Sequence, residues 1–343
     1  MVMYIKKKIA FRFDVSKKIG YGHFMRCLSI AEKLNKKYSF DIYFIVNKEF
    51  SSNFLIQSKR INIIHLKKIK NRSDEEKSIQ KLLNDMKINS IFFDIKKNYS
   101  NNFIKKLYQE NIKIITIDDK YNKRIHSHVC FYPPVPQVKM MNWSAFKGKK
   151  FIGWQYIPLR NQFESIKNNR ASSKKILILS GGSNGKNFTC QILKNINHFK
   201  KRLELVILLG FKGILDNNFK RIIKNSPHKI KIIKSKYIVN KLISESSIII
   251  SPFGVSVYEI VALQKYPIIF TYSKDDEISA SIFHNANIGY SIRNTVNFNE
   301  IVFNKIINKY QKYLLNKKIK YSKYIRSGTE KIAKIINETI KNK

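Results

Sequence analysis

The chain has 343 residues, 43% of them hydrophobic, and a formal net charge of +43 from 66 Lys and Arg against 23 Asp and Glu. This length exceeds what one core usually organises, and the apolar content excludes a largely disordered chain, so we expect two domains. The charge suggests nucleic-acid binding, but lysines occur in nearly every loop and polar helix face, and no known nucleic-acid-binding motif accompanies them. We therefore interpret the charge as mostly solvated surface, with weak attraction to anionic surfaces and no specific nucleic-acid partner.

The cysteines and the N-terminal residues indicate a reduced compartment. Cys27, Cys130 and Cys190 are too far apart to suggest a disulfide framework or a zinc site. The first eight residues become charged too early for a signal peptide, and no apolar run approaches the roughly 20 residues that span a bilayer. We expect a cytoplasmic monomer without a metal or a cofactor.

The first half alternates short β-branched or aromatic runs with helical segments. Strands are predicted at Ile9–Val15, Phe40–Val46, Ile61–Leu66, Ser90–Ile95, Ile112–Asp118 and His128–Tyr132, and helices at Phe24–Leu34, Glu75–Met86 and Asn102–Glu110. Buried strands separated by helices indicate a parallel sheet that is covered on both faces. The run Pro133-Pro134-Val135-Pro136 interrupts the pattern, and we place a hinge near Pro158 to Arg170.

The second half starts the same pattern again. Strands are predicted at Lys175–Leu179, Leu203–Leu209, Lys229–Ile233, Ser247–Ser251 and Pro267–Tyr272, with a helix over Thr189–Ile196. Beyond residue 299 the chain is lysine-rich and strongly helical. The sequence thus predicts an α/β fold of two Rossmann-like, doubly wound parallel sheets around a cleft. The expected domains are residues 1–160 and 161–298, followed by a helical extension over 299–343.

The first motif is Gly20-Tyr21-Gly22-His23, between a predicted strand and a predicted helix. Glycines permit the tight turn, and a helix start offers unpaired N–H groups to an anion. His23 would face whatever ligand lies there, and histidine titrates near neutral pH, as a general base should. The alternative is an ordinary turn with a surface histidine.

Two later loops combine a strand end, small residues and a helix start. Gly181, Gly182 and Ser183 would let backbone amides approach a diphosphate. A helix beginning near Val255 carries Ser256 and Glu259 in its first turns. Glu259 could accept hydrogen bonds from a ribose diol, or it could only stabilise its own helix as an acid near the N-terminus.

The acidic run Lys274-Asp275-Asp276-Glu277 follows the next predicted strand. A loop there would reach the sugar of a nucleotide sugar. The alternative for Asp275 and Asp276 is a solvated charged turn.

Taken together, these motifs resemble the PseG/SpsG family, within the MurG-like GT-B group. The opening signature is Phe11-Arg12-Phe13-Asp14, then Ile19 to His23, then Arg26-Cys27-Leu28. Later matches follow in chain order: Ile117-Asp118-Asp119, Ser180 to Ser183, Ser251 to Pro267, Lys274 to Asp276 and Gly328 to Ala333. Characterised members are UDP-2,4-diacetamido-2,4,6-trideoxy-β-L-altropyranose hydrolases of pseudaminic acid biosynthesis.

The resemblance implies a GT-B fold and the inverting hydrolysis of a UDP-sugar in nonulosonate or surface polysaccharide biosynthesis. His23 matches the family's catalytic histidine, and Asp14 matches a strand-end aspartate that could orient it. Substrate-binding positions would be Gly20, Gly22, Arg26, Gly181, Gly182, Ser183, Ser256, Glu259, Asp275 and Asp276.

The sequence departs from the family pattern mainly on the sugar side. Asp275-Asp276 replaces a common Asn-Gln pair, Ile95 follows Asp94 where a polar residue is frequent, and Phe131 to Pro134 replaces an Asp-Gln-Asn-like stretch. The exchange of amides for carboxylates removes hydrogen-bond donors beside the substrate, so the sugar is left open.

Three functions are consistent with the sequence. The first is a cytoplasmic UDP-sugar hydrolase, which the Gly-His-x-x-Arg-Cys signature favours. The second is a glycosyltransferase of the same fold that uses a UDP-amino-sugar donor. The third is a non-catalytic nucleotide-sugar or nucleic-acid binder, against which His23 and Asp14 argue.

Overall fold

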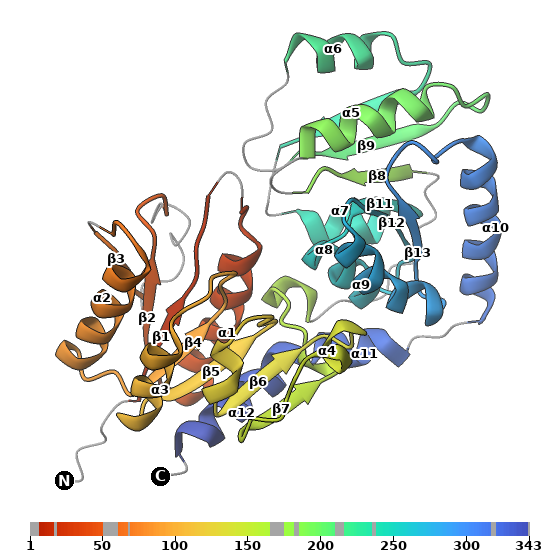
Figure 1. The fold of residues 1–343 in the computed structure, drawn as a ribbon. Coiled ribbons are helices and arrows are strands. Elements are labelled where there is room, and N and C mark those ends of the chain that lie inside the picture. Colours follow the sequence, from red (N-terminus) through yellow and green to blue (C-terminus); the bar gives the residue numbers. More distant parts are fainter. Residues whose placement is uncertain are drawn as a thin grey trace. The chain divides into compact units, whose positions relative to one another are not determined.

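The computed structural model describes residues 7–16, 19–50, 61–67, 69–164, 175–181, 185–209, 216–234, 238–316 and 320–341. Its contacts divide the chain into two compact units. The N-terminal unit comprises Met1–Pro134, Val138–Arg160 and Ser327–Lys343, and the C-terminal unit comprises Val135–Gln137 and Asn161–Arg326. Each unit is built on its own parallel sheet (Figure 1).

The described part of the N-terminal unit has a seven-stranded sheet in the order β3-β2-β1-β4-β5-β6-β7. All neighbouring strands pair in parallel. The strands are β1 (Lys8–Arg12), β2 (Asp41–Val46), β3 (Ile61–His65), β4 (Ser90–Phe93), β5 (Lys113–Ile117), β6 (Val129–Tyr132) and β7 (Lys149–Ile152). The strand order reverses between β1 and β4 in the middle of the sheet. The carboxyl ends of these two strands therefore form the switch point, which is where sheets of this kind bind their ligands.

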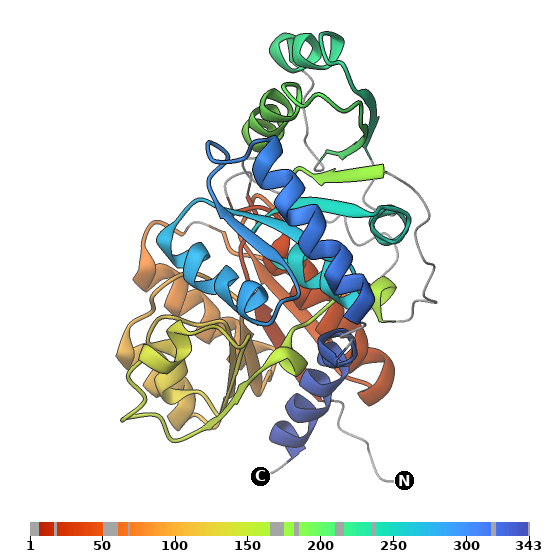
Figure 2. The ribbon, with the colours of Figure 1, turned by 90° about the vertical axis from the view of Figure 1, so that its right-hand side faces the viewer.

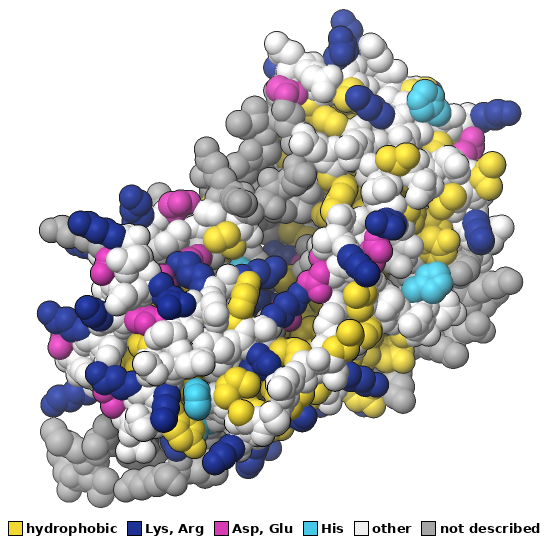
Figure 3. Space-filling model, viewed as in Figure 1, with side chains coloured by type: hydrophobic (Ala, Val, Ile, Leu, Met, Phe, Trp, Pro, Cys, Tyr) yellow, Lys and Arg dark blue, Asp and Glu magenta, His cyan; other side chains and the backbone are white. Residues whose placement is uncertain are grey.

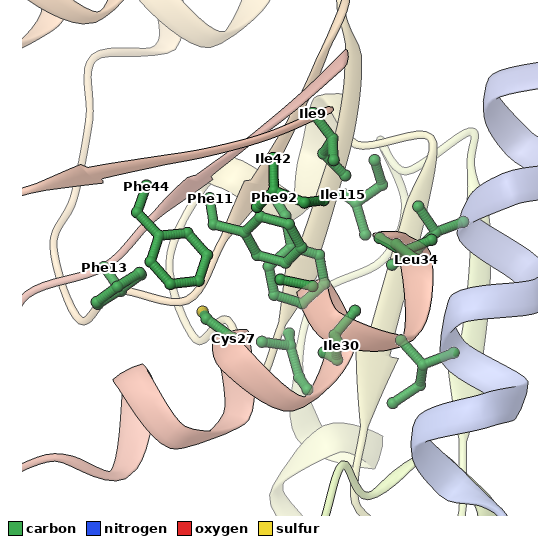
Figure 4. Packing of buried hydrophobic residues seen from close by; sticks show 14 of the residues in the cluster. Ile9, Phe11, Phe13, Cys27, Ile30, Leu34, Ile42, Phe44, Phe92 and Ile115 are labelled. Atoms are coloured by element: carbon green, nitrogen blue, oxygen red, sulfur yellow. The ribbon is translucent and has the colours of Figure 1, made fainter. Parts of the chain in front are cut away.

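Helices cover both faces of this sheet. They are α1 (Gly22–Tyr38), α2 (Arg72–Asp85), α3 (Asn101–Gln109) and α12 (Gly328–Lys341), with the short α4 (Gln137–Met140) and 3-10 turns at Lys123–His126 and Trp154–Tyr156. Alternate strand residues point to opposite faces, so Phe11 packs with α1 and α12 while Ala10 packs with α2 and α3. Figure 4 shows the first of these layers, in which the rings of Phe11, Phe44 and Phe92 lie above α1.

The last helix, α12, is fixed to the N-terminal unit at its first turn. The Thr329 hydroxyl donates to the Leu159 carbonyl and accepts from the Leu159 amide, both at 2.9 Å. A Cβ at Gly328 would lie 2.1 Å from the carbonyl oxygen of Ile157, so only glycine fits against this backbone. Glu330 forms an ion pair with Lys37 of α1.

In the C-terminal unit the described strands form a second parallel sheet in the order β10-β9-β8-β11-β12-β13. They are β8 (Lys175–Leu179), β9 (Glu204–Leu208), β10 (Lys229–Ile233), β11 (Ile248–Pro252), β12 (Pro267–Thr271) and β13 (Tyr290–Arg293). Its helices are α5 (Gly185–Ile196), α6 (Asn217–Lys224), α7 (Val239–Glu245), α8 (Val255–Ala262), α9 (Lys274–Asn285), α10 (Glu300–Asn316) and α11 (Lys320–Arg326), with a 3-10 turn at Asn161–Phe163. Figure 2 shows α10 lying along this sheet, and Phe303 of α10 packs 5.3 Å from the ring of Phe199.

The doubly wound α/β fold predicted from the sequence is confirmed, and each predicted strand overlaps an observed one. Two edge strands, β7 and β13, and helices α4, α6, α7 and α9 lie outside the predictions. The segment expected as a helical extension is divided: α10 and α11 belong to the C-terminal unit, whereas α12 belongs to the N-terminal one.

Lysine and arginine side chains are spread over the visible face of both units (Figure 3). Within the described ranges, every helix is too short or too polar to span a lipid bilayer.

Replacing Gly328 by alanine is expected to lower the free energy of unfolding by about 1–3 kcal/mol, because the new methyl must displace the Ile157 carbonyl. Urea unfolding of this variant and of Lys334→Ala, at an exposed position of the same helix, provides the comparison. Equal stabilities for the two variants would contradict the close contact.

Candidate active site

The turn that leads into α1 places His23 at the carboxyl edge of the first sheet. The Gly20 amide donates to the Ser16 carbonyl at 2.8 Å, and Gly20 has a φ of +78°, a left-handed conformation that glycine adopts without strain. Helix α1 begins at Gly22, so His23 is its second residue. The histidine therefore stands at a helix start beside the end of β1.

Asp94 reaches the same place from the neighbouring strand. It follows β4 directly, and its amide donates to the Arg12 carbonyl of β1 at 3.0 Å. Because β1 and β4 are the two strands between which the order reverses, His23 and Asp94 meet at the switch point.

Three side chains form the centre of the site. The Asp94 carboxylate accepts from His23 Nδ1 at 2.5 Å through Oδ1. Arg26, one turn along α1 from His23, donates to both carboxylate oxygens, from Nε to Oδ2 at 2.9 Å and from Nη2 to Oδ1 at 2.5 Å. The Asp94 side chain is 1% exposed, and those of His23 and Arg26 are each 13% exposed.

This arrangement selects a tautomer of His23. An ionised carboxylate can only accept, so the proton of the 2.5 Å contact belongs to Nδ1. Arg26 Nη2 also lies 3.2 Å from Nδ1, but it can only donate and is directed to Asp94 Oδ1 at 2.5 Å, so we assign it to the carboxylate and not to the ring. The lone pair is then on Nε2, which becomes the atom able to take a proton. A carboxylate that orients a histidine in this way is the arrangement found in general-base catalysis.

Arg26 keeps Asp94 ionised. Burial alone raises the pKa of Asp94, but the attraction of Arg26 and His23 outweighs it and holds that pKa well below its usual range. Cys27 lies in the same buried region, with its Sγ 3.8 Å from Asp94 Oδ2. Burial first and Asp94 second raise the pKa of the Cys27 thiol, which argues against a nucleophilic thiolate.

Asp118 is the second acid of the site. It follows β5, has a φ of +52°, and its Oδ2 lies 3.7 Å from Arg26 Nη1. Its neighbour Asp119 instead pairs with Lys123 at 2.6 Å, with both side chains 1% exposed. Of this acidic pair, Asp118 is the member that approaches Arg26, and we call His23, Arg26, Asp94 and Asp118 together the His23 cluster.

Asp14 occupies a different position from the one expected. Its Oδ1 pairs with Arg12 Nη1 at 2.6 Å, and its Oδ2 pairs with Lys97 at 3.0 Å. Both oxygens are thus engaged away from His23, and the expectation that Asp14 orients the histidine is wrong. Asp94 takes that place, because it ends the strand that neighbours β1 and meets His23 there.

Asp14 belongs to a largely buried charge network that also contains Arg12, Glu75, Lys97 and Tyr99. Arg12, 1% exposed, donates to Glu75 Oε1 from both Nε and Nη2, at 3.0 and 2.6 Å. Lys97 pairs with Glu75 at 2.9 Å as well as with Asp14, and Tyr99 donates to Glu75 at 2.6 Å. Lys97 lies three residues after Asp94, so the network fixes the loop that carries Asp94.

The two predicted loops of the C-terminal unit also meet at a switch point, between β8 and β11. Gly181 has a φ of +75°, and a Cβ there would lie 2.7 Å from Cγ of Pro252, which ends β11. Gly182 and Ser183 lie outside the described residues. In α8, Ser256 is the second residue and Glu259 the fifth, and Glu259 is 2% exposed.

The acidic run after β12 is a helix start rather than a loop. Asp275 and Asp276 lie in the first turn of α9, and the Ser273 side chain caps it by accepting from the Asp276 amide at 3.1 Å. The Asp275 side chain accepts from Gln137 at 3.0 Å, within the same unit. Acids in the first turn stabilise a helix, so this position explains their presence without a ligand.

Asp94 and Asp118 were not among the predicted site residues. The available signal was that each follows a buried strand of the first sheet, as Asp14 nearly does. In the described residues, no group of three or more His, Cys, Asp and Glu side chains is arranged to hold a metal ion.

Comparison with known proteins shows the fold. No protein-family profile matches the chain. It is 26% identical over 298 residues to the uncharacterized protein MJ1062 of Methanocaldococcus jannaschii, covering 78% of this chain and 56% of that protein, so it spans little more than half of that relative. MurG of Acinetobacter baumannii aligns with a TM-score of 0.62 at 12% identity, covering 97% of this chain and 99% of that chain.

UDP-GlcNAc 2-epimerase of Neisseria meningitidis, solved with bound UDP-GlcNAc, aligns with a TM-score of 0.63 at 16% identity, covering 98% of this chain and all of the other. The chain has the GT-B fold. Sequence identities of 12% and 16% establish a shared fold only, so the evidence for a reaction comes from the residues of the site.

Glu75→Gln is expected to cost about 3–5 kcal/mol at neutral pH, because it leaves Arg12 and Lys97 with one carboxylate fewer in a buried network. Burial alone raises the pKa of Glu75, but Arg12, Tyr99 and Lys97 together lower it from 4.5 to about 2. A lowered folded-state pKa contributes stability above pH 4.5 that disappears as the pH falls toward 2. Urea unfolding at several pH values should show the difference between wild type and variant shrinking in that window.

The matched control is Glu110→Gln, an acid whose side chain accepts a hydrogen bond from Gln80 at an exposed site. It should change stability by less than about 0.5 kcal/mol. A Glu75→Gln deficit that stays constant from pH 7 to pH 2.5 would show that the ionised carboxylate does not stabilise the fold.

Proposed function

We propose that this chain is a UDP-sugar enzyme in which His23 deprotonates the nucleophile that displaces UDP from the anomeric carbon. The observation that carries the proposal is the His23 imidazole, bonded through Nδ1 to a buried, ionised Asp94 at the switch point of its sheet. The likeness in fold to MurG and to a UDP-GlcNAc 2-epimerase solved with UDP-GlcNAc supports a UDP-sugar as substrate.

Each residue of the site has a different role in this reaction. Nε2 of His23 takes the proton of the attacking hydroxyl or water, and Asp94 stabilises the imidazolium that results. Arg26 prevents Asp94 from taking the proton itself, because it keeps that carboxylate ionised. The electron pair of the broken glycosidic bond leaves with UDP.

The C-terminal unit would bind the nucleotide. Loop amides near Gly181 and the start of α8 near Ser256 could stabilise the charge of the departing diphosphate. Glu259 would accept from the ribose, and Gly182 and Ser183 would contact the diphosphate. The position of Asp275 and Asp276 in the first turn of α9 favours a structural role for them over a role in sugar binding.

Two nucleophiles are consistent with this base. An acceptor hydroxyl, which would make the chain a glycosyltransferase with a UDP-amino-sugar donor, is supported by the MurG-like fold. Water, which would make it a hydrolase such as those of pseudaminic acid biosynthesis, is supported by the Gly22-His23 and Arg26-Cys27 signature. The comparisons support transfer better than hydrolysis.

The deciding experiment measures UDP release from UDP-N-acetylglucosamine and from UDP-diacetamido sugars, with and without candidate acceptors, for wild type and His23→Ala. Release that depends on an acceptor identifies a transferase, and release without one identifies a hydrolase. In either case His23→Ala should lose activity while still binding UDP. Full activity in that variant, or conversion to an epimeric UDP-sugar without net UDP release, would overturn the proposal.

Asp94→Asn is expected to lower kcat by about 10²–10⁴-fold, because an amide in place of the carboxylate lets His23 adopt the wrong tautomer. Asp14→Asn serves as the matched control: it should destabilise the buried network and lower kcat far less. The reverse order of effects on kcat would restore Asp14 as the orienting acid.

A further inference from the structure

Asp118 is the acid of the His23 cluster that a ligand can reach. Its side chain is 32% exposed, whereas that of Asp94 is 1% exposed and is already bonded to His23 and Arg26. A carboxylate at the carboxyl edge of a doubly wound sheet lies where such sheets bind their ligands.

The backbone holds Asp118 in place. Its φ of +52° lies in the left-handed region, which aspartate tolerates better than most residues. Its amide donates to the Phe131 carbonyl of β6 at 2.9 Å. The backbone of Asp118 is thus fixed at the end of β5, next to β6.

Arg26 faces two acids with different parts of its guanidinium. Nε and Nη2 donate to Asp94 at hydrogen-bond distances, while Nη1 lies 3.7 Å from Asp118 Oδ2, which is longer than a hydrogen bond. Nη1 can only donate and an ionised carboxylate can only accept. Side by side, they form a donor and an acceptor, and a matching ligand carries one acceptor and one donor on neighbouring groups.

We propose that Arg26 Nη1 and Asp118 bind the sugar of the UDP-sugar at a ring hydroxyl and the acetamido N–H on the adjacent carbon. The hydroxyl oxygen accepts from Nη1, and the N–H donates to Oδ2. Phosphate, which offers only acceptors, is repelled by the Asp118 carboxylate. Asp118 thereby selects a sugar that presents a hydrogen-bond donor beside the bound hydroxyl, as an acetamido N–H does, and this inference rests on the proposed function.

Asp118→Gly tests an effect on ligand binding without disturbing the fold. Glycine adopts the left-handed conformation without strain, and the substitution removes the side chain with its carboxylate. Calorimetric titration with UDP-N-acetylglucosamine should show affinity about 10–100-fold lower than in wild type, since a hydrogen bond to a charged group is lost. Affinity for UDP alone and the thermal unfolding midpoint should not fall.

Two further variants complete the test. Asn111→Gly, at another left-handed position with a φ of +58°, should change neither affinity. Asp118→Asn keeps an acceptor oxygen and should recover part of the lost affinity for the UDP-sugar.

The outcomes distinguish this inference from the proposed function. Wild type that binds both ligands, together with Asp118→Gly of unchanged UDP-sugar affinity, would overturn the inference and leave the function standing. Loss of kcat with an altered pH profile but unchanged KM would show that Asp118 acts only by positioning Arg26, which also overturns it. Wild type that binds neither UDP nor the UDP-sugar would overturn the proposed function, and the inference with it.

Discussion

The buried charge of Asp94 is the constraint on which the site depends. An unpaired carboxylate in the interior would cost several kcal/mol, so the residues around it have to supply opposite charge and hydrogen bonds. Arg26 supplies both and binds both oxygens, and His23 completes the set from one turn earlier on the same helix. The histidine therefore takes its orientation from the requirement to stabilise a buried carboxylate.

The strand order explains why these groups meet. In both sheets the chain returns to pair a later strand beside the first one, β4 beside β1 and β11 beside β8. At the first such edge the loops supply ionisable side chains, which suit proton transfer. At the second they supply Gly181 and Pro252 in close contact, and small residues let a backbone approach a diphosphate. Under the proposed function, one topology would serve two kinds of chemistry through different loop residues.

Most strands and several helices of the fold could be predicted from the sequence, because buried strands and amphipathic helices leave strong periodic patterns of apolar residues. The Gly-x-Gly-His motif indicated His23, but not its partner. Asp14 is the nearest acid before the motif along the chain, whereas Asp94 is 71 residues from His23 and is identified only once β4 is known to lie beside β1. The short edge strand β7 has an exposed lysine-rich pattern and gives little signal. In the sequence Asp275 and Asp276 resemble a charged loop, because a lone serine such as Ser273 is a weak signal for the helix N-cap that it forms.

The most direct test of this account is the tautomer of the neutral His23 ring, measured by ¹⁵N NMR of histidine-labelled protein over a pH series. The account predicts that the neutral ring carries its proton on Nδ1, and that Asp94→Asn loses this tautomer while the fold is retained. A neutral ring protonated on Nε2 in the wild type, or a tautomer that Asp94→Asn leaves unchanged, would contradict it.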